Sequence, residues 1–117
     1  MNGEKILKTA FALACESYED FRDKDMLTKW LNIAVAECMT ARDIKENADG
    51  GIFLTDIYGE IRLPPYICTV AMPYAVAECI FRYRDDGENS RLMNEKLKAA
   101  LSKAAEEKDI EAVYLYV

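Results

Sequence analysis

The chain has 117 residues, a length that suits one compact domain. Hydrophobic residues make up 51% of it and charged residues 31%, a balance that excludes an intrinsically disordered protein. Fifteen Lys and Arg against 21 Asp and Glu leave a net charge of -6, which disfavours non-specific binding of nucleic acid through the whole surface.

Two amphipathic helices are expected first, over residues 3–18 and 25–47. In both, apolar residues recur at intervals of three and four, which places them on one face of a helix. The first set is Leu7, Ala10, Phe11, Ala14 and Tyr18. The second set is Leu27, Trp30, Leu31, Ala34, Cys38 and Ala41. Asn47, Asp49, Gly50 and Gly51 predict the end of the second helix and a loop.

The periodicity changes between residues 52 and 63. Phe53, Thr55 and Ile57 alternate with their neighbours, and a turn is expected at Gly59. This pattern predicts a short β-hairpin or an extended loop between the second and third helices. Because an isolated hairpin is marginally stable in water, its apolar side must meet either the helices or another molecule.

A third helix is expected over residues 64–84, opened by Pro64 and Pro65, and a fourth over residues 89–108. The third is apolar on nearly every side, so it belongs at the centre of a bundle, and Pro73 predicts a kink within it. Its aromatic residues have helical spacing, which favours core packing over a stacking platform for single-stranded nucleic acid. They are Tyr66, Tyr74, Phe81 and Tyr83.

These elements predict one mainly α domain over residues 1–117, a four-helix bundle-like fold. Residues 112–117 form an expected extended segment and a possible C-terminal strand, because Tyr114, Leu115, Tyr116 and Val117 favour strands. The apolar run from Tyr66 to Tyr83 is too short and too polar for a membrane span, so we expect no contact with a membrane.

Catalytic and metal-binding patterns are missing from the sequence. It contains no His, and its four Cys form no CxxC pair. We therefore expect no catalytic residues, no metal and no cofactor, and we expect buried, reduced thiols in a cytoplasmic protein without a signal peptide. The cysteines are Cys15, Cys38, Cys68 and Cys79.

Glu37 and Glu78 lie within apolar helices, where a carboxylate is costly unless it is paired. One interpretation is an acid–base pair or a metal-binding pair in the bundle. The other, which we favour, pairs Glu78 with Arg82 one turn on and leaves Glu37 at a helix edge or beside another Arg.

Two apolar segments have no evident internal packing partner: the loop between helices two and three, and the C-terminus. We weigh packing within the chain equally against contact with another subunit by strand addition. The residues of this candidate interface are Phe53, Leu54, Ile57, Tyr58, Tyr114, Leu115, Tyr116 and Val117.

The order of elements, with Ile61-Arg62-Leu63-Pro64-Pro65 entering a Tyr- and Ala-rich helix and a polar break at Arg84-Asp85-Asp86-Gly87, resembles small head-tail connector proteins of tailed bacteriophages. The resemblance implies a non-enzymatic structural protein, encoded by a prophage, that is made in the bacterial cytoplasm and ends in the virion neck. It implies a ring of copies that contacts the portal or tail-completion proteins, through which DNA passes without sequence-specific binding. The alternative is a small helical protein-binding module or regulator.

Overall fold

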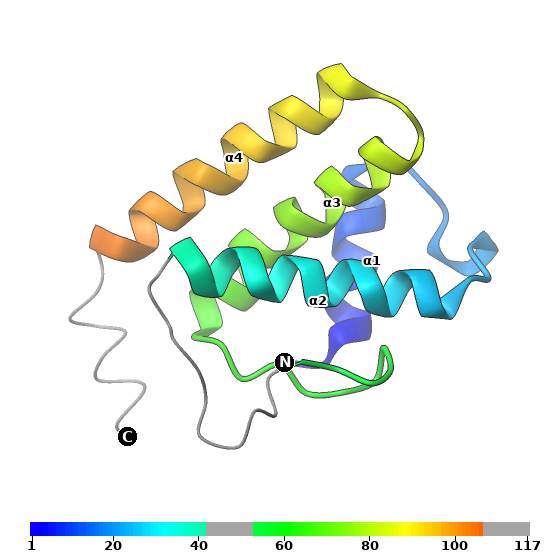
Figure 1. The fold of residues 1–117 in the computed structure, drawn as a ribbon, viewed down its shortest axis with the longest axis horizontal. Coiled ribbons are helices and arrows are strands. Elements are labelled where there is room, and N and C mark those ends of the chain that lie inside the picture. The colour runs from blue at the N-terminus through cyan, green and yellow to red at the C-terminus, as the bar shows by residue number, and fades with distance from the viewer. Residues whose placement is uncertain (42–52, 107–117) are drawn as a thin grey trace.

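The structure is a computed structural model and describes residues 1–41 and 53–106. Four α-helices account for most of these residues (Figure 1): α1 (Gly3–Leu13), α2 (Lys24–Ala41), α3 (Met72–Tyr83) and α4 (Gly87–Glu106). A short 3-10 helix, η1 (Tyr18–Asp20), lies between α1 and α2, and a π-helix, η2 (Ile67–Ala71), leads directly into α3. The predicted mainly helical class is confirmed. The expected extended segment 112–117 lies outside the described residues.

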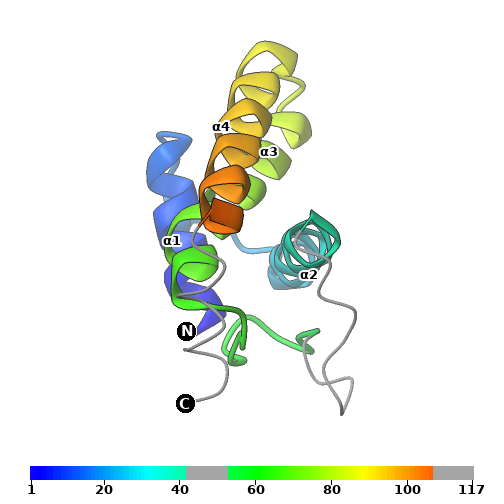
Figure 2. The same ribbon diagram turned by 90° about the vertical axis from the view of Figure 1, so that its left-hand side faces the viewer.

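Helix α3 occupies the centre of the molecule, as its apolar sequence predicts. It contacts α1, α2 and α4, and α4 also packs along η2. Figure 2 shows α1 and α2 on opposite sides, with α3 and α4 between and above them. One hydrophobic core joins side chains from all four helices and from the loop before η2. Fully buried Leu7, Leu31 and Met72 belong to it, and each such side chain contributes roughly 2 kcal/mol.

Helix α1 ends at Leu13 instead of near residue 18, and the backbone shows why. The N–H of Glu16 donates to the carbonyl of Phe11 at 2.9 Å, and the N–H of Cys15 donates to Ala12 at 3.1 Å. This is the Schellman arrangement, which closes a helix through one residue in the left-handed region. Cys15 takes that conformation, with a φ of 55°. Glycine is the residue that usually marks this position, and because Cys15 occupies it, the sequence did not indicate that the helix ends here.

The segment before α3 is a π-helix because of Pro73. A proline in the second position of α3 has no N–H to donate, and its ring crowds the carbonyl four residues earlier. The wider π turn accommodates it, and the N–H of Met72 donates to the carbonyl of Ile67, five residues back. The predicted perturbation by Pro73 therefore takes the form of a π turn. None of the described helices, this apolar one included, is long and apolar enough to cross a membrane.

The sequence predicted a short β-hairpin or an extended loop between the second and third helices, and the structure shows no hairpin in the described part, residues 53–63. Residues 53–63 contain a turn and no hairpin strands, and their β pairing is one isolated antiparallel bridge between Asn2 and Glu60. Leu54 and Ile57 are buried three residues apart, which is the spacing of a turn, whereas Ile61 and Leu63 are buried two residues apart, as in extended backbone. The loop therefore packs on the helices as an irregular segment, the other arrangement that the sequence allowed.

Candidate functional site

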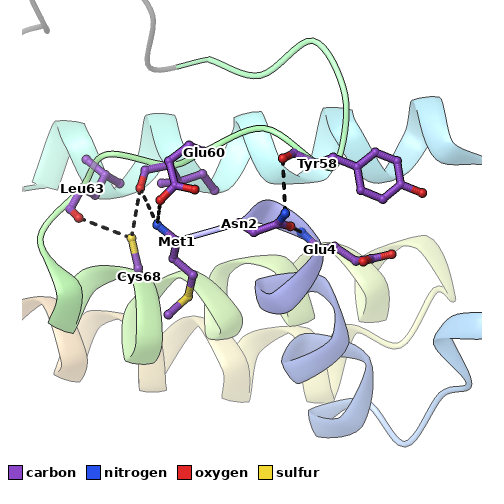
Figure 3. A network of polar contacts seen from close by, with 8 residues as sticks. Met1, Asn2, Glu4, Tyr58, Glu60, Leu63 and Cys68 are labelled. Atoms are coloured by element: carbon purple, nitrogen blue, oxygen red, sulfur yellow. Dashed lines mark hydrogen bonds and ion pairs between the residues drawn. The ribbon is translucent and has the colours of Figure 1, made fainter.

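The loop between α2 and α3 is fastened to the start of the chain by a set of backbone hydrogen bonds (Figure 3). The N–H of Gly3 donates to the carbonyl of Gly59 at 3.0 Å, and the N–H of Ile61 donates to Met1 at 2.8 Å. The Met1 amine donates to the Glu60 carboxylate and to the carbonyl of Ile61. The hydrogen bond from this amine holds the pKa of the Glu60 carboxyl below its usual range. These bonds thus fix the position of residues 58–61 relative to residues 1–3.

Further polar contacts continue this network on both sides. The side-chain amide of Asn2 donates to the carbonyl of Tyr58 at 3.3 Å and accepts from the N–H of Glu4 at 2.7 Å, which also caps α1. The Cys68 thiol lies 3.4 Å from the carbonyl oxygen of Leu63, at the entry to η2. Figure 3 shows two sets of contacts, one around Met1 that reaches Cys68 and one around Asn2 that reaches Tyr58, and the two are joined by the chain from Met1 to Asn2.

Two of the four predicted interface residues in this loop point inward. Leu54 and Ile57 are buried in the core. They lie against Gly3, where an added Cβ would stand 2.8 Å from the carbonyl oxygen of Ile57 and 3.1 Å from Leu54 Cδ1. Asn32 of α2 fixes the same point, because its side chain makes two hydrogen bonds with the backbone of Leu54. Leu54 and Ile57 therefore fasten the loop to the helices.

The other two residues of the predicted interface point outward. Phe53 is 52% exposed and Tyr58 is 53% exposed. The Tyr58 hydroxyl accepts a hydrogen bond from Lys24 Nζ at 3.1 Å, and the same ammonium lies 5.5 Å from the ring centre. The remaining residues of the prediction, Tyr114, Leu115, Tyr116 and Val117, lie outside the described residues. The described part of the interface is thus a firmly held loop with two exposed aromatic rings.

A second candidate region is an aromatic cluster that joins α1, η1, α2 and α3. The ring of Phe21 lies 5.3 Å from Trp30 and 6.0 Å from Tyr83, and Trp30 lies 5.5 Å from Tyr83. Phe11 adds a fourth ring, 5.7 Å from Phe21. These rings line a pocket of about 170 Å³ with polar groups at its rim. Tyr83, expected in the core, is 60% exposed here.

The carboxylates Glu37 and Glu78 lie close enough to influence each other. Glu78 is only 4% exposed, and the Arg82 guanidinium donates to its Oε1, so the predicted pair one turn apart is confirmed. Its Oε2 has no hydrogen-bond partner among the described residues. Burial raises the pKa of the Glu37 carboxyl, Glu78 raises it further and Arg82 lowers it. Glu37 of α2 thus lies in the electrostatic environment of Glu78 and Arg82 of α3.

The cysteines and acids do not combine into a metal site in the described part of the chain. No group of three or more potential ligands gathers there. Cys38, Cys68 and Cys79 are buried, whereas Cys15 is exposed. Burial raises the pKa of the Cys38 and Cys79 thiols to about 12, so both remain protonated at neutral pH and behave as small apolar side chains.

Comparison of the chain with models of known protein families, with curated proteins and with solved structures finds no match. Sequence reasoning missed the roles of Asn32, Gly3 and the Trp30 pocket. For Asn32 the available signal was an asparagine among the apolar residues of α2, since even a partly buried amide needs hydrogen-bond partners.

Proposed function

We propose that this chain is a structural, non-enzymatic subunit that assembles with copies of itself, as in the head-tail connectors of tailed bacteriophages. Its partners in that role are neighbouring copies and a portal or tail-completion protein. The observation that carries the proposal is the loop between α2 and α3, which is anchored by buried Leu54 and Ile57 and presents Phe53 and Tyr58 to solvent.

The anchoring supports an interface better than exposure alone does. Association costs less when a contact segment is already ordered, because fewer conformations are lost on binding. Here the backbone bonds to Met1 and Gly3 and the side chain of Asn32 hold the loop in place before any partner arrives. Large exposed aromatic residues are also the residues that protein interfaces favour.

Light-scattering mass across a concentration series tests the proposal. The full chain is expected to rise toward a large closed oligomer, and the double variant Phe53→Ser, Tyr58→Ser is expected to remain smaller at the same concentration. A variant that lacks Val113 to Val117 tests the C-terminal half of the predicted interface in the same way. Leu92→Ser is the matched control, because Leu92 is an exposed apolar residue of α4, 44% accessible, that lies away from the loop.

The alternative function, a small helical module that binds one other protein, predicts a different result. The chain would remain a monomer or dimer at every concentration and would form a lasting one-to-one complex with its partner. The pocket beside Trp30 is the observation that favours this alternative, since it provides a concave aromatic site separate from the loop.

A further inference from the structure

The pocket beside Trp30 combines aromatic walls with the exposed carboxylate of Asp20, which has no ion-pair partner among the described residues. We infer that it binds the arginine side chain of a partner protein. The inference concerns a site distinct from the anchored loop and does not depend on the connector proposal.

The walls of the pocket come from parts of the chain that meet only in the folded state. Phe21 follows η1, Trp30 lies in α2 and Tyr83 ends α3. The planes of Phe21 and Tyr83 meet at 74° and those of Trp30 and Tyr83 at 67°, so these rings pack edge to face and together line one side of the pocket. Trp30, only 5% exposed, forms the floor of the pocket, and Phe21 and Tyr83 keep the ring surface that a guest can reach. Stacking on accessible aromatic rings is one way in which proteins bind organic cations.

The charges at the rim leave one negative charge without a partner. Arg84 and Glu16 neutralise each other, since Arg84 Nη1 lies 2.9 Å from Glu16 Oε1. The same guanidinium also donates to the carbonyl of Ala14 at 3.1 Å and lies 5.4 Å from the Phe81 ring centre. Asp20 lines the pocket as well and is exposed to solvent, and within residues 1–41 and 53–106 its carboxylate makes no ion pair and no side-chain hydrogen bond.

These features select a cation over an anion or a purely apolar guest. Arg84 is engaged on several sides, so it does not offer a free positive charge to an anion. An apolar guest would place no charge opposite the exposed carboxylate of Asp20. The net charge of -6 adds a general attraction for cations.

Among cationic side chains, arginine fits best. Its planar guanidinium stacks on aromatic rings and can donate two parallel hydrogen bonds to one carboxylate, whereas a lysine ammonium is a compact, strongly hydrated point charge. Ser17 and the Asp20 carboxylate are the polar groups available at the rim to accept those hydrogen bonds.

Trp30 gives a direct test because it is the only tryptophan of the chain. A blocked peptide with a single arginine is titrated into the full-length protein, up to the millimolar range, while the fluorescence of Trp30 is followed. We expect a saturable change, with weaker binding of the matching single-lysine peptide and no binding of the single-glutamate peptide.

Two variants place the binding at this pocket. Asp20→Asn keeps the shape of the side chain but removes its charge, and Tyr83→Ala removes an exposed wall; each is expected to weaken arginine binding by about 5-fold. The matched controls are Glu95→Gln and Leu92→Ala, exposed substitutions on α4 that should leave binding unchanged. Circular dichroism verifies that all four variants fold.

A saturable signal that weakens in Asp20→Asn and Tyr83→Ala supports an arginine site. An absent signal, equal binding of the lysine and arginine peptides, or a signal that survives both pocket substitutions overturns it.

Discussion

The side-chain amide of Asn32 pairs with both backbone polar groups of Leu54. Asn32 Nδ2 donates to the Leu54 carbonyl at 2.9 Å, and the Leu54 N–H donates to Asn32 Oδ1 at 2.8 Å. One side chain thus provides the donor and the acceptor that a neighbouring strand would otherwise provide. This pairing joins α2 to the loop that carries Phe53 and lets an irregular segment lie against the core.

Replacement of Asn32 by Ala should destabilise the fold and loosen the loop. Two partly buried backbone groups would lose their partners, at a cost of roughly 2 kcal/mol. Urea unfolding measures the loss, and amide hydrogen exchange at Leu54 should accelerate well beyond exchange in α4. Asn94→Ala is the matched control, because the Asn94 side chain makes no hydrogen bond to the described residues. Equal effects of the two substitutions would contradict the role given to Asn32.

Gly3 is a packing requirement at the start of α1. A Cβ added there would stand 2.8 Å from the backbone oxygen of Ile57 and 2.9 Å from Leu31 Cδ1. The backbone oxygen belongs to the anchored loop, so relief requires the loop to move. We expect Gly3→Ala to lower the free energy of unfolding by about 2 kcal/mol, despite the better helix propensity of alanine.

Gly87 provides the control for that measurement. It begins α4, and an added Cβ would meet no atom of the described residues within 4 Å. Gly87→Ala should therefore stabilise the protein by about 0.5 kcal/mol through the reduced entropy of the unfolded chain. Thermal or urea unfolding of both variants compares Gly3, where a Cβ would clash, with Gly87, where it would not. A loss of stability in Gly87→Ala would contradict this prediction.

Helices α1 and α3 end in the same Schellman geometry, and each places a non-glycine residue in the left-handed region. Cys15 has a φ of 55° and Asp85 a φ of 58°. The N–H of Asp86 donates to the carbonyl of Phe81 at 2.9 Å, as Glu16 does to Phe11 in α1. Because left-handed backbone costs a side-chain-bearing residue about 1 kcal/mol, Cys15→Gly and Asp85→Gly should each raise stability by up to that amount.

Calorimetry or urea unfolding of the two glycine variants checks this expectation. Both positions are exposed, so the substitutions remove little packing. Cys15→Ala and Asp85→Ala are the comparisons, since alanine retains the Cβ and with it the steric cost. A glycine variant no more stable than its alanine partner would mean that the strain is relieved elsewhere.

The helices could be predicted because their signal is local. Leu7 and Phe11 are four residues apart in the sequence and share one helix face, so periodicity alone places them in the core. The ends of the helices were harder to predict, because Cys15 closes α1 in a conformation that sequence patterns assign to glycine.

The loop could not be predicted from its own residues, because its partners lie far away along the chain. The alternation of Phe53, Thr55 and Ile57 suggested a strand, yet the bridge to Asn2 and the pairing with Asn32 favour a turn that buries Leu54. The Trp30 pocket could not be predicted for the same reason, since Phe21, Trp30 and Tyr83 are far apart in the sequence and meet only when α2 and α3 pack together.

The raised pKa of Glu37 gives a stability that depends on pH. Burial is the largest cause, the neighbouring Glu78 adds to it, and Arg82 opposes both. The folded protein therefore holds the Glu37 proton more tightly than the unfolded chain, in which the carboxyl has its ordinary pKa of 4.5. The stabilisation linked to this proton is complete below about pH 4.5 and is lost as the pH rises through the raised pKa of the folded state.

Glu37→Gln removes that dependence, because its amide is neutral at every pH. Above the raised pKa the variant should be more stable than the natural chain, and the difference should shrink as the pH falls toward 4.5. Urea unfolding of both proteins between pH 4.5 and pH 7.5 measures it, and changes common to the whole molecule cancel in the difference. The same substitution at an exposed position of α4, Glu95→Gln, is the control for replacing a glutamate by glutamine. A stability difference between Glu37→Gln and the natural chain that stays constant from pH 4.5 to pH 7.5 would mean that the partial burial of Glu37 and its proximity to Glu78 do not raise the pKa of its carboxyl, contrary to this prediction.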